Sequence, residues 1–177
     1  NVTLPLRYLA IDWQVEEAEN RGAKLILAVG RKTPRWPECH IPGWVEQLPT
    51  KEQDEKLFSF VKQVIERYKG LSAITTWQVE NEPFLPFGEC ESKSASILDR
   101  EIALVRSLDS RPILTTDSGE ISDWYRAASR GDIFGTTMYR KVWSKHFGQV
   151  NYHLPPAHFR LKRALVELFV GKKPMMV

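Results

Sequence analysis

The sequence lacks the long apolar runs, cysteine clusters and glycine-rich phosphate loops that mark several large classes of protein. No apolar stretch approaches the ~20 residues that a membrane-spanning helix needs. Only two of the 177 residues are cysteines, which is too few for a disulfide scaffold, and they do not form the C-x-x-C pair of structural zinc sites. No G-x-G-x-x-G or G-x-x-x-x-G-K motif follows a predicted strand, and this disfavours a nucleotide-binding function.

The composition is that of a single globular domain. Apolar residues make up 42% of the chain and charged residues 27%, as in ordinary globular proteins. We therefore expect one domain over residues 1–177. Because the chain begins at Asn1 and stops within the apolar run Met175-Met176-Val177, we also expect it to be a fragment of a longer protein.

Charge is divided unevenly along the chain. Residues 1–125 hold 15 Lys and Arg against 20 Asp and Glu, whereas residues 126–177 hold 10 against 2. A basic segment can bind nucleic acid or anionic lipid. The basic side chains are scattered rather than gathered in one block, so we interpret them as a solvated face and expect no nucleic-acid partner.

Short apolar runs alternate with segments of helical periodicity. The predicted strands are residues 24–29, 74–79, 112–116, 133–138 and 174–177. The predicted helices are residues 8–20, 50–69, 93–108, 121–129 and 157–170. Long loops are expected at residues 30–50 and 139–155.

Local signals add detail to this pattern. Thr50-x-x-Gln53 predicts a capping box at the start of a helix. Ser118 is expected to cap the helix that follows it. Trp13 and Trp77 are expected in the core.

The alternation of strands and helices implies a parallel sheet with right-handed crossovers. An open doubly wound sheet and part of a (β/α)8 barrel both fit this order. A complete barrel typically needs about 250 residues, so this chain is too short to form one. In either architecture the functional side chains follow the carboxyl ends of the strands.

One strand end carries a recognisable motif. The predicted strand at 74–79 runs directly into Glu80-Asn81-Glu82-Pro83. An Asn-Glu-Pro at the end of a strand resembles the signature at barrel strand 4 of the clan A retaining glycoside hydrolases, a superfamily that includes the family 5 cellulases. The resemblance implies that Glu82 is the general acid/base, and that Asn81 hydrogen-bonds the 2-hydroxyl of the sugar being cleaved.

The same resemblance implies a fold class and a boundary. The chain would be a partial (β/α)8 TIM barrel, from approximately strand 3 to the start of strand 7. In the superfamily the nucleophile is a second glutamate at the end of strand 7, so it is expected beyond Val177. The resemblance implies no metal or organic cofactor, and its partner is an oligo- or polysaccharide. Aromatic loops of this kind suit glucans, mannans and short glycosides alike.

Further candidates for substrate binding lie after the other strands: Trp36, His40, Trp44, Asp117 and Tyr139. Tryptophan rings offer flat apolar faces to sugars, and polar side chains can bond the hydroxyls. We predict that Glu82, Asn81, His40, Asp117 and Tyr139 converge on one concave site. The alternatives are loop packing for the tryptophans and a structural role for the polar residues.

The proposed acid also has local requirements. A retaining glycosidase needs one protonated and one ionised carboxyl group ~5–5.5 Å apart. Burial and a nearby like charge raise a carboxyl pKa and keep it protonated near neutral pH. Pro83 is expected to restrict Glu82 to extended backbone.

The two cysteines permit two readings. Cys39 and Cys90 follow consecutive strands, so a disulfide could join their loops. Free thiols are the favoured expectation, because the compartment is unknown.

Two other functions remain open from the residues. One is a non-catalytic carbohydrate-binding or interaction module with an open parallel sheet. The other is a nucleic-acid binder that uses the basic residues of 126–177.

Overall fold

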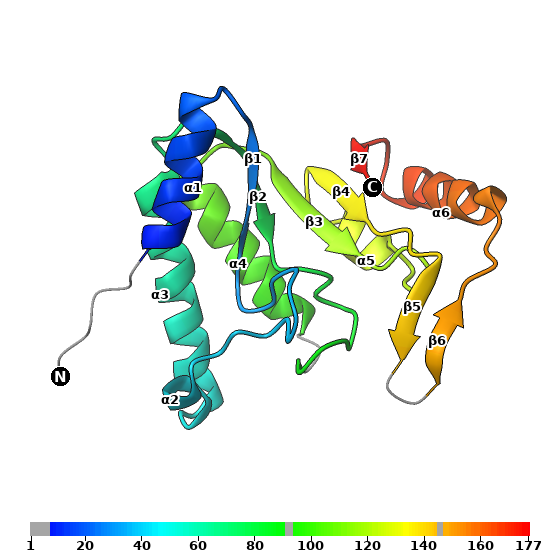
Figure 1. The fold of residues 1–177 in the computed structure, drawn as a ribbon, viewed down its shortest axis with the longest axis horizontal. Coiled ribbons are helices and arrows are strands. Elements are labelled where there is room, and N and C mark those ends of the chain that lie inside the picture. Colours follow the sequence, from blue (N-terminus) through cyan, green and yellow to red (C-terminus); the bar gives the residue numbers. More distant parts are fainter. Residues whose placement is uncertain (1–7, 91–93, 145–146) are drawn as a thin grey trace.

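The computed structural model describes residues 8–90, 94–144 and 147–177. Five parallel strands form one sheet in the order β1-β2-β3-β4-β7, which is also their order along the chain (Figure 1). The strands are β1 (Leu25–Val29), β2 (Ile74–Val79), β3 (Ile113–Asp117), β4 (Ile133–Thr136) and β7 (Met175–Met176). This order confirms the predicted barrel arc, because a doubly wound sheet would reverse its order at a switch point.

Helices separate successive strands of the sheet. They are α1 (Leu9–Asn20), α2 (Gly43–Glu46), α3 (Thr50–Tyr68), α4 (Ala95–Leu108), α5 (Tyr125–Ala128) and α6 (Pro156–Phe169). A separate antiparallel hairpin, β5 (Lys141–Ser144) with β6 (Gly148–Asn151), precedes α6. The predicted loop at 139–155 therefore contains two short strands.

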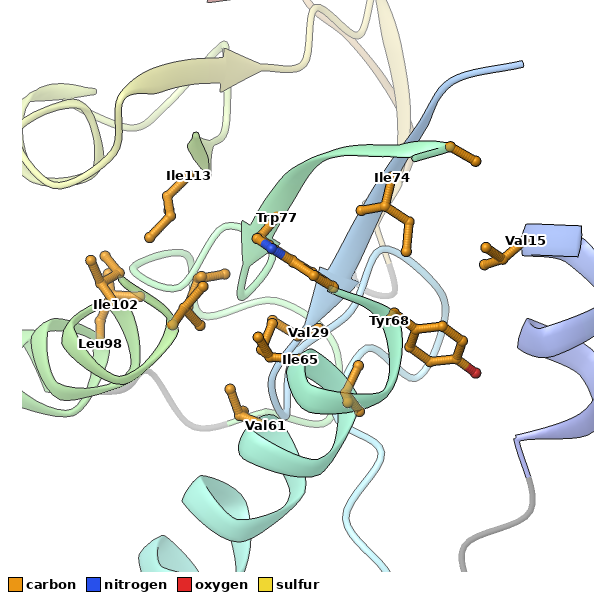
Figure 2. Close-up of a cluster of buried hydrophobic side chains, with 14 of the residues drawn as sticks. Val15, Val29, Val61, Ile65, Tyr68, Ile74, Trp77, Leu98, Ile102 and Ile113 are labelled. Atoms are coloured by element: carbon orange, nitrogen blue, oxygen red, sulfur yellow. The ribbon is translucent and has the colours of Figure 1, made fainter. Parts of the chain in front are cut away.

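The larger of two cores lies between β1, β2 and the helices α1, α3 and α4 (Figure 2). Val61, Ile65 and Tyr68 recur at helical spacing on α3 and are buried. Trp77 on β2 is fully buried, as expected, and its Nε1 donates a hydrogen bond to Asp109 Oδ2 at 3.0 Å. The smaller core is built around Trp124 and packs α5 and α6 against β4.

Three local expectations are wrong. Trp13 is 64% exposed, because it lies about 200° around α1 from the buried Val15. Thr50 is already helical and follows the N-cap Pro49, with no side-chain cap, so the capping box does not form. Ser118 does not cap a helix, since α5 is short and begins only after Trp124.

Candidate active site

The exits of β2, β3 and β4 meet around Glu82. The Glu82 backbone N–H donates to Thr116 Oγ1 on β3 at 2.9 Å. Thr137 Oγ1, directly after β4, donates to Glu82 Oε1 at 3.2 Å. Glu82 therefore lies at the carboxyl edge of the arc, where a barrel places its functional groups. One residue of chain separates its bonding partner Thr137 from Tyr139.

The environment of Glu82 favours the protonated carboxyl. Its side chain is 7% exposed, and burial is the main cause that raises its pKa above the ordinary value. The negative charges of Glu38 and Asp117 act in the same direction. The Thr137 hydrogen bond and the positive charge of Lys32 oppose them.

The backbone at Glu82 is not extended, which corrects the expectation drawn from Pro83. Glu82 has a φ of 43°, and Glu80 has a φ of 59°. Non-glycine residues in this left-handed region cost about 1 kcal/mol or more, and they persist where surrounding contacts fix them. Here Lys32 Nζ donates to the Glu82 carbonyl at 2.9 Å and to the Leu85 carbonyl at 2.7 Å, so tertiary contacts override the local preference.

Glu80 has a structural role beside Glu82. It is 1% exposed, and its carboxylate accepts the backbone N–H groups of Arg31 at 2.9 Å and Lys32 at 2.6 Å. Gly30 makes this possible: its φ is 126°, and a Cβ there would lie 2.7 Å from the Glu80 carboxyl carbon. Glu80 thus fixes the end of β1 to the end of β2.

Asn81 is half-buried beside these glutamates. Its backbone N–H donates to the Lys32 carbonyl at 2.8 Å. Its side-chain oxygen accepts from Gln78 Nε2 at 3.1 Å. Within the described part of the chain no group accepts a hydrogen bond from the Asn81 side-chain nitrogen, so this donor is open to a ligand.

Asp117 ends β3 and is 1% exposed. Burial is the main cause that raises its pKa, against hydrogen bonds from the Ser122 side chain and the Ser118 backbone. It lines a pocket of about 300 Å³ together with Phe84 and Arg126. Asp117 and Glu82 are close enough for the charge of Asp117 to raise the pKa of Glu82.

The other predicted ligands lie further out. Trp36 is 65% exposed and meets the Phe87 ring edge to face, with ring centroids 6.2 Å apart. His40 is exposed, and its Nε2 lies 3.2 Å from the Arg35 carbonyl oxygen. Trp44 is exposed on α2.

Tyr139 is 57% exposed and lines a pocket of about 410 Å³ with Tyr152 and Phe159. No hydrogen bond or ring contact within residues 8–90, 94–144 and 147–177 joins Glu82 to Tyr139, to His40 or to the two loop tryptophans. The contacts thus bring Glu82, Asn81 and Asp117 together, whereas the convergence of the remaining residues stays a prediction.

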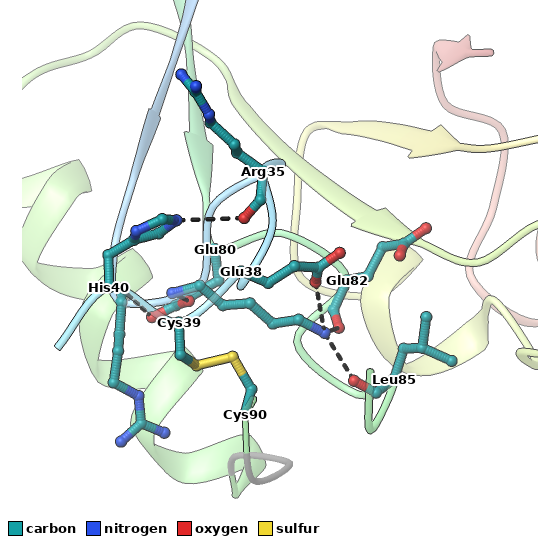
Figure 3. The surroundings of a disulfide bond; sticks show 10 residues. Arg35, Glu38, Cys39, His40, Glu80, Glu82, Leu85 and Cys90 are labelled. Atoms are coloured by element: carbon teal, nitrogen blue, oxygen red, sulfur yellow. Dashed lines mark hydrogen bonds and ion pairs between the residues drawn. A yellow bond between two sulfur atoms is a disulfide. The ribbon is translucent and has the colours of Figure 1, made fainter. Parts of the chain in front are cut away.

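The two cysteines form a disulfide, so the expectation of free thiols is wrong. Cys39 and Cys90 are bridged with their Cα atoms 5.3 Å apart. The bridge joins the loops that follow β1 and β2, and it lies beside Glu38 (Figure 3). The disulfide can form because both loops leave neighbouring parallel strands at the same edge of the sheet.

Sequence reasoning did not single out three residues that contact Glu82 or shape its charge: Lys32, Glu38 and Thr137. Two signals were present. Lys32 lies two residues after Gly30, at the exit of an apolar strand, and Glu38 directly precedes Cys39.

Within the described ranges no cluster of three or more His, Cys, Asp or Glu side chains could hold a metal ion. No helix in those ranges is long and apolar enough to cross a membrane.

Comparison with solved structures shows the fold. β-D-Glucuronidase from Dictyoglomus thermophilum matches 94% of the chain with a TM-score of 0.60 and 19% identity. A GH113 β-1,4-mannanase matches 93% with a TM-score of 0.53 and 16% identity. β-Galactosidase from the psychrophilic Marinomonas ef1 matches 78% with a TM-score of 0.52 and 14% identity. No protein-family model matches the sequence, and no curated protein matches it.

The chain therefore has the fold of part of a (β/α)8 barrel. It spans 27% of the glucuronidase, 49% of the mannanase and 34% of the galactosidase. At these identities the likeness is one of fold, and it does not single out the family 5 cellulases.

Proposed function

We propose that this chain is part of the catalytic domain of a retaining glycoside hydrolase, with Glu82 as its general acid/base. One observation carries the proposal: a buried carboxyl group with a raised pKa stands on an Asn-Glu-Pro motif at the carboxyl edge of a barrel arc. A general acid needs its pKa close to the working pH, and the surroundings of Glu82 move its pKa in that direction.

The proposed reaction has two steps. Glu82 protonates the glycosidic oxygen as the bond to the sugar breaks, while a carboxylate on the opposite side forms a covalent glycosyl-enzyme. Glu82, now ionised, then takes a proton from the water that releases the sugar. Asn81 would donate its open side-chain N–H to the sugar 2-hydroxyl.

The nucleophile is proposed to come from the segment that continues β7 beyond Val177. Two other buried acids, Glu80 and Asp117, do not suit this role. Glu80 is occupied by two backbone N–H groups. The raised pKa of Asp117 disfavours the ionised form that a nucleophile requires.

The proposed substrate is a β-linked glycoside of an oligo- or polysaccharide. The structural neighbours include a β-D-glucuronidase, a β-1,4-mannanase and a β-galactosidase. Trp36, Trp44 and Tyr139 expose large aromatic surface that can stack on sugar rings. No cofactor is part of the proposal.

The test is Glu82→Gln in the protein that carries this chain together with the rest of the barrel. Glycosides with poor leaving groups should lose about 10²–10⁴-fold in kcat/KM, the usual contribution of acid/base assistance. Activated aryl glycosides need less protonation and should lose less at the glycosylation step.

Glu89→Gln is a matched control, because Glu89 is exposed on a neighbouring loop. Wild-type rates on both substrate types in Glu82→Gln would overturn the proposal. Binding of an oligosaccharide without hydrolysis by the wild-type protein would instead favour a carbohydrate-binding module.

A further inference from the structure

A buried ion pair lies beneath the candidate acid/base. Lys32 and Glu38 are 4% and 8% exposed, and Lys32 Nζ lies 3.4 Å from Glu38 Oε2. Both residues belong to the loop after β1, where an antiparallel bridge pairs Lys32 with Cys39. A buried pair of this kind is seldom a source of stability, because desolvation offsets the attraction between the charges. Its position therefore calls for another explanation.

Lys32 connects this pair to the loop that carries Glu82. Its ammonium group donates to the carbonyl oxygens of Glu82 at 2.9 Å and Leu85 at 2.7 Å. Glu38 Oε2 lies 3.4 Å from the same ammonium group, so the two side chains form an ion pair. The contacts hold Glu82 in its left-handed conformation, with φ at 43°.

Glu38 presents a charge that hydrogen bonds do not neutralise. Its Oε2 atom is buried and accepts no hydrogen bond from the described residues. Figure 3 shows the Glu38 side chain extending from the disulfide loop toward Glu82. The Cys39–Cys90 bridge adjoins Glu38 in the chain and anchors this loop to the loop after β2.

We propose that Lys32 and Glu38 are positioning residues: Lys32 holds the backbone of Glu82 in place, and the pair sets the charge around the Glu82 carboxyl. This inference rests on the proposed function of Glu82. The pair acts through Glu82 and does not touch the substrate in the proposed reaction. Its two members have opposite effects on the acid, and that opposition makes the inference testable.

The charged groups that face Glu82 come from two strand exits. Glu38 and Lys32 lie after β1, and Asp117 lies at the end of β3. The Glu38 charge raises the pKa of Glu82, and the Lys32 charge lowers it. Replacing Glu38 with glutamine removes the first effect and leaves Lys32 uncompensated, so both changes lower the pKa of Glu82.

The experiment measures the pH dependence of kcat/KM in the protein with its complete barrel. The alkaline limb reports the pKa at which the free enzyme loses its catalytic proton. Glu38→Gln should move this limb to lower pH, because the loss of a nearby like charge lowers the pKa of the Glu82 carboxyl. Lys32→Met keeps the apolar stem and should move the limb to higher pH. Glu89 is exposed and precedes Cys90 in the chain, so Glu89→Gln should leave the alkaline limb unchanged.

The outcomes separate the two proposals. If Glu82→Gln retains wild-type activity, the proposed function fails. If Glu82→Gln is impaired but the alkaline limb of Glu38→Gln stays at the wild-type pH, the inference fails and the proposed function stands. A loss of kcat in Glu38→Gln at all pH values, with the alkaline limb unmoved, would also overturn the inference. That result would assign Glu38 a purely structural role.

Thermal melts of each variant show whether it is folded. Should Glu38→Gln or Lys32→Met fail to fold, Glu38→Asp provides the second test. It keeps the charge but shortens the side chain, so it should fold, and its weaker effect on Glu82 should place the alkaline limb below that of the wild type. An alkaline limb at or above the wild-type pH in Glu38→Asp would contradict the inference.

Discussion

Removal of the Cys39–Cys90 bridge should cost a large part of the stability of the protein. The two cysteines are 51 residues apart in sequence. In the chain-entropy model, a loop of that length lowers the entropy of the unfolded chain enough to contribute about 4 kcal/mol at 25 °C. A typical domain is stable by only about 5–15 kcal/mol, so Cys39→Ala/Cys90→Ala should be marginally folded.

The assay is urea denaturation of the oxidised wild type and of the double variant, followed by tryptophan fluorescence. The free energy of unfolding should fall by about 2–4 kcal/mol. Reductant should destabilise the wild type by a similar amount and should leave the double variant unchanged. Alanine is chosen because it adds no unpaired hydroxyl at the two half-buried positions.

A loss below about 1 kcal/mol would refute the reasoning, because one ordinary surface substitution approaches that size. Equal sensitivity of the wild type and the double variant to reductant would also refute it, since the variant has no bridge to reduce.

Two further predictions concern the fold. Gly30→Ala should destabilise the protein by about 2 kcal/mol or more, since the φ of Gly30 is 126° and an added Cβ would lie 2.7 Å from the Glu80 carboxyl. Gly43 has open space around its Cβ position, so Gly43→Ala should change the free energy of unfolding in urea titrations by less than about 1 kcal/mol. Hydrogen bonds from Arg67 lower the pKa of Asp12, so this carboxylate stabilises the fold above its unfolded pKa of about 3.9. Melting midpoints of the wild type and Asp12→Asn should therefore converge as the pH falls from about 5 to 2, and a constant difference would contradict this.

The arc of the barrel could be predicted from the sequence because its strands differ in composition from the helices between them. β2 is rich in β-branched and aromatic residues, and Ile74, Thr76, Trp77 and Val79 are buried, as is typical of a strand inside a sheet. The β5–β6 hairpin could not be predicted in this way. Its strands have four residues each, and their inward side chains are only half-buried, so the alternation that marks a strand is too short to stand out.

The candidate site was predicted only where one local motif contains it. Asn81 and Glu82 are neighbours in the chain, so a resemblance could identify both. Lys32 and Glu82 are 50 residues apart, and their contact depends on the pairing of β1 with β2. No periodicity or local spacing encodes such a contact. The disulfide is a different case: consecutive strands place both cysteine loops at one edge of the sheet, but the sequence does not reveal whether the compartment is oxidising.

The backbone at Glu80 and Glu82 explains how two nearby carboxylates take different tasks. Residues two apart on an extended strand point to the same face of a sheet. Here the chain leaves β2 through left-handed residues, and the carboxylate of Glu80 bonds the end of β1 while that of Glu82 bonds the end of β4. β1 and β4 lie on opposite sides of β2 in the sheet. The left-handed turn thus directs the Glu80 carboxylate to the scaffold and the Glu82 carboxyl across the edge of the arc, where the proposed general acid would act. An extended Glu82, as Pro83 alone would favour, would not achieve this separation.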